Sequence, residues 1–347
     1  MWEVMGQDRA VSFLRSSLNK GNTAHAYLLV GSPNVGKMTL ALNLAQALNC
    51  EEAEPPCGQC NSCQKIASTK HADIQIIGLI SSGNSSESKA KAEIGIDQIR
   101  EVQHSANLPP FEGKYKVFII DEAELLSTEA ANCLLKTLEE PISKVVFILL
   151  VRNDRLLPAT VVSRCQIIEL LPMAIDKVES FLINHRRIEP QKAQLLARLS
   201  HGYLGWAISA SRDARLMEER INKIDKLLEL VKSDYEERFT YSAQLASQFS
   251  QNRQMVLGVL DLWVDLWRDL LLIKSDQNNF VTNIDKLDAL VILAKNIGLI
   301  DMKKIIHGIR SAMEQLSQNA NPRLVLEVLM LDMPIVRKTE IAGLIKK

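Results

Sequence analysis

The sequence predicts an α/β fold, a parallel sheet with helices on both faces, followed by a small helical domain and an all-helical C-terminal domain. Three observations predict this class. Short apolar runs alternate with helical patterns in the first half of the chain, a glycine loop follows the first run, and apolar residues repeat at helical spacing beyond residue 172. We place the domains at residues 1–171, 172–212 and 213–347.

The overall composition is that of a globular protein. The 347 residues are 47% hydrophobic and 24% charged, which suits about two or three domains. Lys plus Arg equals Asp plus Glu, at 41 each, so the balance argues against a free-standing DNA binder. No apolar run approaches the ~18 residues of a membrane span, and the start lacks the features of a signal peptide. We therefore expect a cytoplasmic protein without a membrane partner.

The first expected element is a short amphipathic helix at residues 7–20, with apolar positions Val11, Leu14 and Leu18. This helix is expected to pack against the α/β core. The preceding segment, residues 4–7, either lines an adenine pocket or caps the core with apolar side chains. The sequence leaves both interpretations open.

The most informative stretch runs from Gly31 to Thr39, between a predicted buried strand and a predicted helix. Strand, glycine loop and helix in this order are the context of phosphate-binding loops. Gly31 and Gly36 let the backbone bend so that its N–H groups converge on an anion, and Lys37 can reach the outer phosphates. An ordinary glycine turn before a helix is the alternative.

Position 38 departs from the phosphate-loop pattern. The pattern has Ser or Thr there, because a hydroxyl ligates the magnesium ion that accompanies a triphosphate. Met38 offers a thioether instead, and the Thr39 hydroxyl comes one residue late, about 100° round the helix. The stretch therefore predicts a nucleotide-binding fold and leaves occupancy by ATP and Mg²⁺ open.

The cysteines are distributed unevenly. Four lie close together in the sequence: Cys50, Cys57, Cys60 and Cys63. In a reducing cytosol such thiols are not expected to form disulfides, and two Cys-x-x-Cys steps can surround one tetrahedral ion. Sulfur ligands favour Zn²⁺, while an iron–sulfur cluster and scattered reduced thiols are alternatives. We expect a structural zinc module near residues 50–63, because no clustered cysteine is left for an open catalytic position.

The next segments alternate between strand, loop and helix. Residues 73–80 predict a strand, and the small polar residues at 81–88 predict a loop. A helical pattern restarts near residue 94, and Pro109 and Pro110 end it.

A buried strand at residues 116–120 leads directly into Asp121 and Glu122. The carboxyl edge of a parallel sheet is where ligands bind, and a phosphate loop needs acidic partners there. Asp121 is expected to hold magnesium, and Glu122 to orient or polarise the attacking water. The alternative is that both residues are ordinary helix caps.

The α/β pattern continues to residue 151. Ala130, Leu134 and Leu138 mark an amphipathic helix that ends at Pro141, and residues 145–151 predict another buried strand. This alternation of strands and helices predicts a parallel sheet.

The segment after that strand contains Ser163-Arg164-Cys165. Together with the preceding motifs, this triplet resembles the AAA+ clamp-loader ATPases of DNA replication, whose Ser-Arg-Cys arginine serves the ATP of the neighbouring subunit. The resemblance implies that Arg164 acts in trans, since a planar guanidinium stabilises the charge that develops in phosphoryl transfer. A surface arginine in an ion pair is the alternative.

The resemblance is strongest to the delta-prime family of bacterial DNA polymerase III subunits and covers essentially the whole chain. Four segments carry it: residues 25–28, 56–63, 71–73 and 130–141. It implies an AAA+ module with a helical lid and a C-terminal helical collar. It also implies a hetero-oligomer, a pentamer with tau/gamma-type and delta-type subunits, that opens the sliding clamp and loads it at primer-template DNA.

Two residues depart from an active clamp-loader motor. Met38 replaces the magnesium hydroxyl, and Trp206 stands where the motor subunits carry a lid arginine. Both departures favour a subunit that hydrolyses its own ATP poorly. Beyond residue 215 the periodicity indicates a helical bundle, in which Trp263 and Trp267 are expected in the core.

Two other functions stay open. An active ATPase motor of the tau/gamma type is favoured by Lys37, Asp121 and Glu122, and the two departures oppose it. The other is a purely structural scaffold that a zinc ion stabilises, and the presence of Arg164 in the Ser-Arg-Cys triplet argues against it. Nothing in the sequence suggests a polymerase active site, so we expect an accessory subunit of a DNA-directed DNA polymerase complex.

Overall fold

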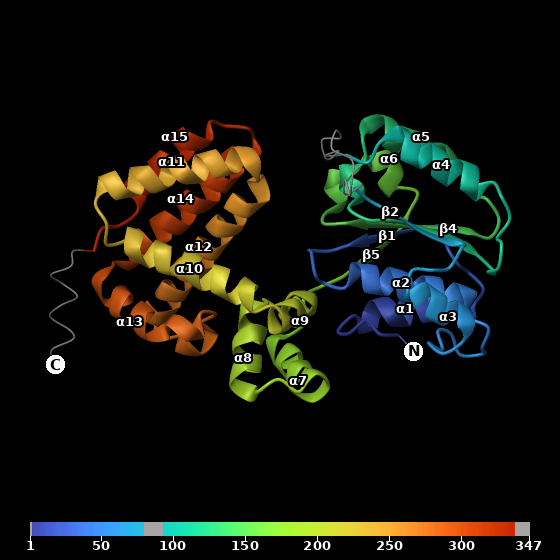
Figure 1. The fold of residues 1–347 in the computed structure, drawn as a ribbon, viewed down its shortest axis with the longest axis horizontal. Coiled ribbons are helices and arrows are strands. Elements are labelled where there is room, and N and C mark those ends of the chain that lie inside the picture. Colours follow the sequence, from blue (N-terminus) through green and yellow to red (C-terminus); the bar gives the residue numbers. More distant parts are fainter. Residues whose placement is uncertain (1, 80–92, 337–347) are drawn as a thin grey trace. The chain divides into compact units, whose positions relative to one another are not determined.

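The computed structural model of the chain describes residues 2–79 and 93–336, which form two compact units. The first unit comprises Met1–Val178 and His201–Trp206, and the second comprises Glu179–Ser200 and Ala207–Lys347. Figure 1 draws both units. The loop predicted at residues 81–88 lies outside the described residues, and the separate helical domain over 172–212 remains a prediction.

The first unit is built on a five-stranded sheet with the order β2-β3-β4-β1-β5, and neighbouring strands are parallel. Its strands are β1 (Ala26–Val30), β2 (Ile74–Ile77), β3 (Lys116–Ile120), β4 (Val145–Val151) and β5 (Gln166–Glu169). The predicted bounds of β3 and β4 are confirmed, and β1 is the buried strand predicted before the glycine loop. The strand predicted over 73–80 is shorter, Ile74–Ile77, and beyond it the Gly78 carbonyl accepts a hydrogen bond from the Gln98 side chain at 3.1 Å; residue 80 of that prediction lies outside the described residues. The sequence patterns did not identify β5.

The strand order places a switch point at β1. The strands that precede β1 along the sheet are β2, β3 and β4, whereas β5 lies on its other side. Parallel sheets bind ligands at the carboxyl ends of strands where the order reverses in this way. The glycine loop that follows β1 therefore opens at the expected edge of the sheet.

Helices cover both faces of the sheet (Figure 1). One face carries α1 (Asp8–Asn19), α2 (Lys37–Asn49) and α3 (Asn61–Ala67), and the other carries α4 (Ile96–Ala106), α5 (Thr128–Glu139) and α6 (Ala159–Val162). Successive side chains of a strand point to opposite faces of the sheet. In β1, Tyr27 and Leu29 pack with the first set of helices, while Ala26 and Leu28 pack with the second. Two short 3₁₀ turns, η1 (Ala123–Leu125) and η2 (Asp154–Leu156), follow β3 and β4. The predicted α/β class is confirmed.

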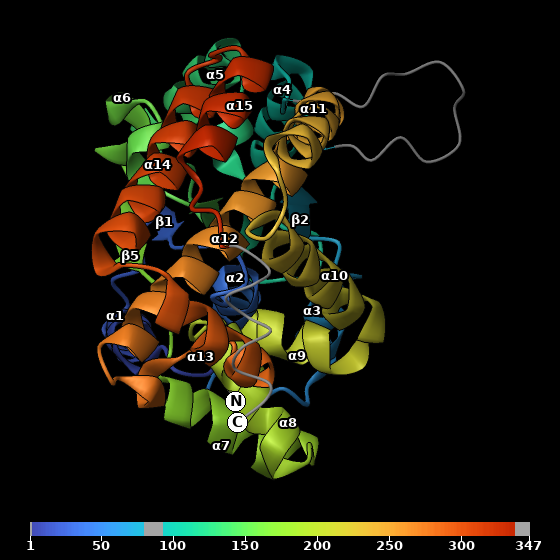
Figure 2. The same ribbon diagram turned by 90° about the vertical axis from the view of Figure 1, so that its left-hand side faces the viewer.

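The remaining elements are helical. They are α7 (Ile175–Arg186), α8 (Pro190–Leu199), α9 (Leu204–Arg212), α10 (Ala214–Leu230), α11 (Tyr235–Gln251), α12 (Arg253–Lys274), η3 (Asn278–Phe280), η4 (Ile284–Lys286), α13 (Leu287–Asn296), α14 (Leu299–Ser317) and α15 (Pro322–Asp332). Helices α11, α12, α14 and α15 pack side by side (Figure 1, Figure 2). Trp263 and Trp267 of α12 are fully buried at the centre of this bundle, so the prediction that they belong to the core is confirmed.

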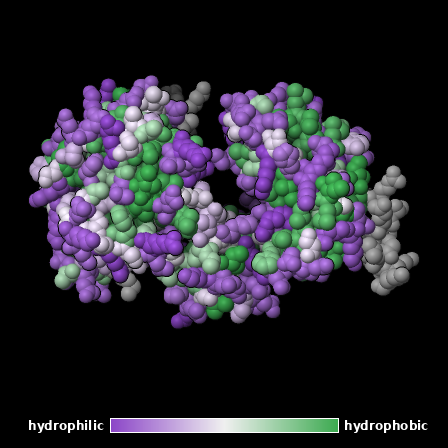
Figure 3. Space-filling view, turned by 180° about the vertical axis from the view of Figure 1, so that it is seen from behind, coloured by the Kyte–Doolittle hydropathy of each residue, from purple (hydrophilic) through white to green (hydrophobic). Residues whose placement is uncertain are grey.

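The surface mixes hydrophilic and hydrophobic residues on the face seen in Figure 3. Within the described residues, none of the helices combines the length and apolar character that crossing a bilayer requires.

Candidate functional site

The predicted phosphate loop lies between β1 and α2, and its backbone requires both glycines. Gly36 caps α2 with a φ of 104°, a conformation that L side chains rarely adopt. A Cβ built on Gly31 would lie 2.8 Å from the carbonyl oxygen of Leu170, just after β5. Substitution at either glycine would therefore strain or displace the loop.

Lys37 begins α2, and its ammonium group turns back onto the loop. The Nζ atom donates to the carbonyl oxygens of Gly31 and Ser32, the latter at 3.1 Å. Burial lowers the pKa of Lys37, while the nearby carboxylates of Glu124 and Asp121 oppose this shift. The structure thus brings Lys37 close to the acidic residues that follow β3.

Met38 occupies the first turn of α2, where the pattern calls for a magnesium ligand. Its side chain is half-buried and packs against the apolar cluster between the sheet and α1 to α3. Thr39 is exposed in the same turn. A thioether is a poor ligand for a hard cation such as Mg²⁺, so position 38 does not supply the oxygen that the phosphate-loop pattern has there.

Asp121 and Glu122 follow β3 at the carboxyl edge of the sheet, as predicted. The Asp121 N–H donates to the carbonyl oxygen of Ile77 in β2 at 2.8 Å, and its Oδ1 accepts from the Glu122 N–H at 3.0 Å. Glu122 has a φ of 48°, so the chain turns sharply here. The carboxylates of Asp121, Glu122 and Glu124 all act to raise the pKa of Lys37, against the effect of its burial.

Arg152 is part of this edge, although the sequence patterns did not single it out. It is the first residue after β4, and its Nη2 lies 3.1 Å from Oε1 of Glu122. Its Nε lies 3.5 Å from Oε1 of Glu124. The rule that identified Asp121, a polar residue directly after a buried parallel strand, applies equally to Arg152 and would have found it.

The start of α9 contacts the phosphate loop. The Tyr203 hydroxyl lies 3.1 Å from Oγ of Ser32, and the Gly205 N–H donates to the Asn34 carbonyl oxygen at 3.1 Å. A Cβ on Gly205 would lie 2.8 Å from that same oxygen, so the approach is close. The half-buried Trp206 follows directly, which places it in the segment seated on the loop.

The N-terminal segment packs as an apolar cap. Val4 is buried in the cluster that contains α2, and its N–H donates to Oδ1 of Asn43 at 3.1 Å. Gln7 donates through Nε2 to the carbonyl oxygen of Leu171 at 2.8 Å. Of the two interpretations of residues 4–7, the cap describes these contacts, and an adenine-binding role stays a prediction.

Arg164 follows α6 and lies in an ion pair at the surface. Its Nη2 lies 2.6 Å from Oε1 of Glu139 at the end of α5, and its Nη1 donates to the Thr160 carbonyl oxygen at 2.8 Å. The two paired side chains keep 34% and 50% of their surface exposed. The ion pair and a role in trans are therefore compatible, since the chain orients the guanidinium and leaves it accessible.

The four clustered cysteines meet at one point of the first unit. All four sulfur atoms lie within 4.8 Å of one another, and Sγ of Cys57 is 3.9 Å from Sγ of Cys63. Sulfurs bound to a tetrahedral zinc ion at 2.3 Å would be about 3.8 Å apart. Cys50 and Cys63 are buried and the other two are half-buried. The donor set and its spacing fit a closed four-sulfur metal site.

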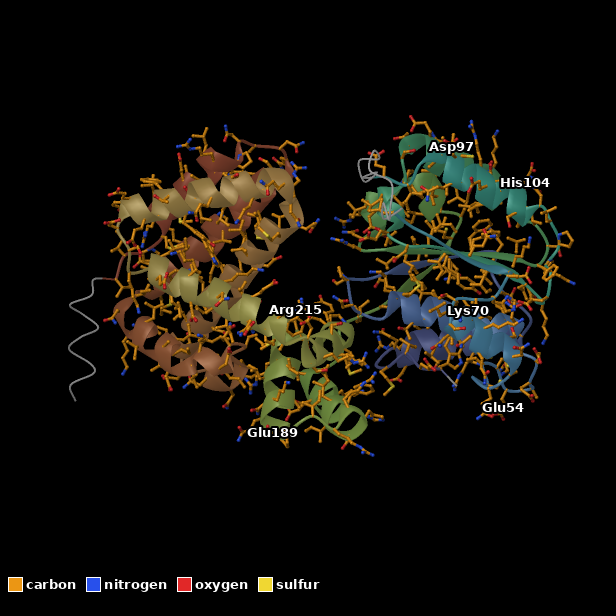
Figure 4. The ribbon with its side chains drawn as sticks, in the orientation of Figure 1. Glu54, Lys70, Asp97, His104, Glu189 and Arg215 are labelled. Carbon is orange, nitrogen blue, oxygen red and sulfur yellow. The ribbon has the colours of Figure 1, made fainter. Side chains whose placement is uncertain are left out.

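Backbone amides surround these sulfurs. The N–H groups of Cys60 and Gln59 lie 3.2 and 3.3 Å from Sγ of Cys57 and lower the pKa of that thiol to about 6. Hydrogen bonds of this kind favour the thiolate, which is the form that binds metal. Glu54, in the loop before Cys57, projects away from the sheet (Figure 4).

The cysteine module is joined to the sheet through a buried polar link. Oγ of Ser62 in α3 lies 3.3 Å from Nε2 of His71, whose Nδ1 accepts from the Asp73 N–H at 3.2 Å. The Asp73 carboxylate in turn accepts backbone N–H groups of residues 111–113 at 2.7 to 2.8 Å. Burial opposes ionisation of Asp73, yet these three N–H groups lower its pKa. The link connects the metal-site candidate to the loop before β3.

The family model and related sequences that match this chain describe subunits of DNA polymerase III. The family model described as "DNA polymerase III, delta subunit" matches residues 6–174. The chain is 31% identical over 290 residues to DNA polymerase III subunit delta' of Bacillus subtilis, which covers 82% of each chain. It is 35% identical over 219 residues to DNA polymerase III subunit tau of Escherichia coli, covering 61% of this chain and 32% of that protein.

The chain thus spans about a third of the length of the tau relatives of Escherichia coli and Salmonella typhimurium. Among solved structures, a gamma subunit-related protein of DNA polymerase III from Thermotoga maritima has a TM-score of 0.43 and 19% sequence identity, covering 93% of this chain and 98% of that one.

Proposed function

The chain belongs to the clamp-loader family of DNA polymerase III, and we propose that within it the chain acts as a delta-prime-type subunit. It assembles with tau/gamma-type and delta-type subunits and takes part in loading the sliding clamp at primer-template DNA. Its own phosphate site is degenerate, and Arg164 serves the ATP of a neighbouring subunit. The match to a delta' relative, which covers 82% of both chains, supports this branch.

The observation that carries the proposal is a contrast between two parts of the first unit. Arg164 is oriented by Glu139 and remains accessible, as a residue that acts on a partner must be. The chain's own loop keeps Lys37 on backbone carbonyls and has Met38 in place of a magnesium ligand. The chain therefore combines an oriented, accessible arginine with a phosphate loop that has a thioether at position 38.

The cysteine site has a structural role in this proposal. Cys50, Cys57, Cys60 and Cys63 would hold one Zn²⁺ ion, since four thiolates complete its preferred tetrahedron and leave no position open for a reacting water. The ion would fix the turn between α2 and α3. Two buried and two half-buried ligands suit a closed site better than a catalytic one.

The two competing functions make different demands on Lys37. In an active motor of the tau/gamma type, Lys37, Asp121 and Glu122 would bind and turn over ATP in this chain. In a pure scaffold neither Lys37 nor Arg164 would matter to ATP use. The delta-prime-type function requires Arg164 and tolerates the loss of Lys37.

The test uses the full assembly with a Lys37→Met change in this subunit only. The proposal expects intact incorporation and an unchanged clamp- and DNA-stimulated ATPase rate, because this site contributes no turnover. The exposed Arg15→Ala change on α1 serves as the matched control for altered surface charge. A clear loss of ATPase activity with Lys37→Met, but not with the control, would favour the motor instead.

A further inference from the structure

We propose that Arg152 keeps magnesium out of the acidic end of the phosphate site, and so disables that site independently of Met38. This deepens the proposed function, on which it rests, because it names a second determinant of the degenerate site. It also names the ligand class that the site rejects, a magnesium-bound nucleoside triphosphate.

The position of Arg152 follows from the order of the sheet. Strands β3 and β4 are neighbours and pair in register, with Ile120 opposite Leu149. Strand β4 continues two residues past this pair, to Val151, so Arg152 emerges level with the turn that follows β3, where η1 (Ala123–Leu125) begins. This brings Arg152 to Glu122 and Glu124, which come from the turn after β3.

Arg152 engages these carboxylates through three of its nitrogen atoms. Nη2 is 3.1 Å from Oε1 of Glu122, and Nε is 3.5 Å from Oε1 of Glu124. The Arg152 backbone N–H also donates to Oε1 of Glu124 at 3.3 Å. A guanidinium that contacts two carboxylates is better oriented than one in a single ion pair, and the Arg152 and Glu122 side chains remain 41% and 43% exposed.

Glu124 lies on the inner side of this arrangement. Its side chain is only 9% exposed, and its Oε2 atom is buried without a hydrogen-bond partner among the described residues. Glu124 is also the strongest of the carboxylates that act on Lys37. The carboxylate thus lies in the field of two cations, Arg152 and Lys37.

The charges at this edge nearly cancel. The carboxylates of Asp121, Glu122 and Glu124 supply three negative charges, and Lys37 and Arg152 supply two positive ones, which leaves a net charge of −1. A magnesium ion needs oxygen ligands and uncompensated negative charge, and a guanidinium paired with two of the three carboxylates takes up part of both. The guanidinium of Arg152 therefore compensates negative charge that a magnesium ion would otherwise compensate.

This placement predicts that Met38 and Arg152 act together. Restoring a hydroxyl with Met38→Thr supplies one magnesium ligand but leaves Arg152 compensating the acidic end, whose net charge stays at −1. Removing the guanidinium with Arg152→Asn frees Glu122 and Glu124 but leaves the ligand at position 38 missing. Only the double variant offers both the oxygen and the charge.

The experiment measures binding of a fluorescent ATP analogue to the full chain, with excess MgCl₂ and with EDTA. The wild type, each single variant and the double variant are compared. Magnesium should tighten binding to the double variant about tenfold, within the range of coupled neighbouring residues, and should change binding to the other three less than about twofold. Circular dichroism and thermal unfolding check that each variant is folded.

A charge-retaining variant separates charge from shape. The chain with Met38→Thr and Arg152→Lys should bind the ATP analogue without a magnesium effect. The chain with Met38→Thr and Arg152→Gln should show the same magnesium effect as the one with Met38→Thr and Arg152→Asn. It replaces the Asn version if the latter does not fold. A full magnesium effect with Met38→Thr alone would overturn the proposal. So would a folded double variant without any magnesium effect. These readouts come from the isolated chain, so they can fail while the role of Arg164 in the assembly stands.

Discussion

Replacing Cys60 by serine tests the cysteine site with little disturbance to its surroundings. Sγ of Cys60 has two roles, since it is one of the four clustered sulfurs and it also accepts the Cys63 N–H at 3.4 Å as the N-cap of α3. Serine is a favoured N-cap residue, so Cys60→Ser keeps the cap and removes one soft metal ligand. The loss of stability then reports on the metal.

The expected magnitude follows from binding linkage. A ligand that binds only the folded chain stabilises it by about 4 kcal/mol when its free concentration exceeds Kd about 1,000-fold. Cys60→Ser should therefore lower the free energy of unfolding by roughly 3–4 kcal/mol. A strong chelator should lower the wild-type value by a similar amount and have little further effect on the variant.

The change should stay local. The phosphate loop is held by Leu170, Val35 and the turn at Gly36, none of which belongs to the cysteine module. Hydrogen exchange should accelerate around α3 and leave β1 and the start of α2 protected. Elemental analysis should find one zinc per wild-type chain. Absence of stoichiometric metal, or loss of the whole α/β fold in Cys60→Ser, would refute this reasoning.

Two further outcomes follow from the phosphate loop. The isolated wild-type chain should hydrolyse ATP barely above background in a steady-state assay. Met38→Thr should not restore turnover, because Trp206 still stands where motor subunits carry a lid arginine. Robust magnesium-dependent hydrolysis by the wild type would instead support an ATPase motor. Gly205→Ala should lower the free energy of unfolding by about 1–3 kcal/mol, because the added Cβ would lie 2.8 Å from the Asn34 carbonyl oxygen. Denaturant unfolding checks this against Gly258→Ala, at an exposed position of α12 where an added Cβ meets nothing within 4 Å and should stabilise the helix slightly. Equal effects at the two glycines would contradict the close contact.

The central strands could be predicted from the sequence because their environment is simple. Residues 116–120 and 145–151 are buried along their whole length, and continuous apolar runs of that kind report burial on both faces of a parallel sheet. The edge strand β5 lacks this signal. In β5 only one of the four residues is buried, so its pattern does not distinguish it from a loop.

Some features of the candidate site could be predicted from local sequence motifs, and others depend on contacts between distant parts of the chain. The glycine loop and the pair Asp121 and Glu122 could be found because a motif fixes their spacing along the chain. The contacts of Arg152 with Glu122 and of Arg164 with Glu139 join residues far apart in the sequence, at 3.1 and 2.6 Å. Such pairs depend on which strands and helices are neighbours, and a single sequence does not give that order.

The most direct test of the delta-prime-type function is the clamp- and DNA-stimulated ATPase rate of an assembly that carries Arg164→Ala in this subunit alone. An arginine acting in trans is worth roughly 10³ to 10⁵ in turnover at the site it serves, whereas an exposed ion pair such as that with Glu139 contributes under about 1 kcal/mol to stability. We predict normal folding and incorporation with a marked fall in ATPase rate, smaller than the full factor because the other sites keep their own arginines. An unchanged rate in an intact assembly would contradict the proposed function and leave Arg164 as a structural residue.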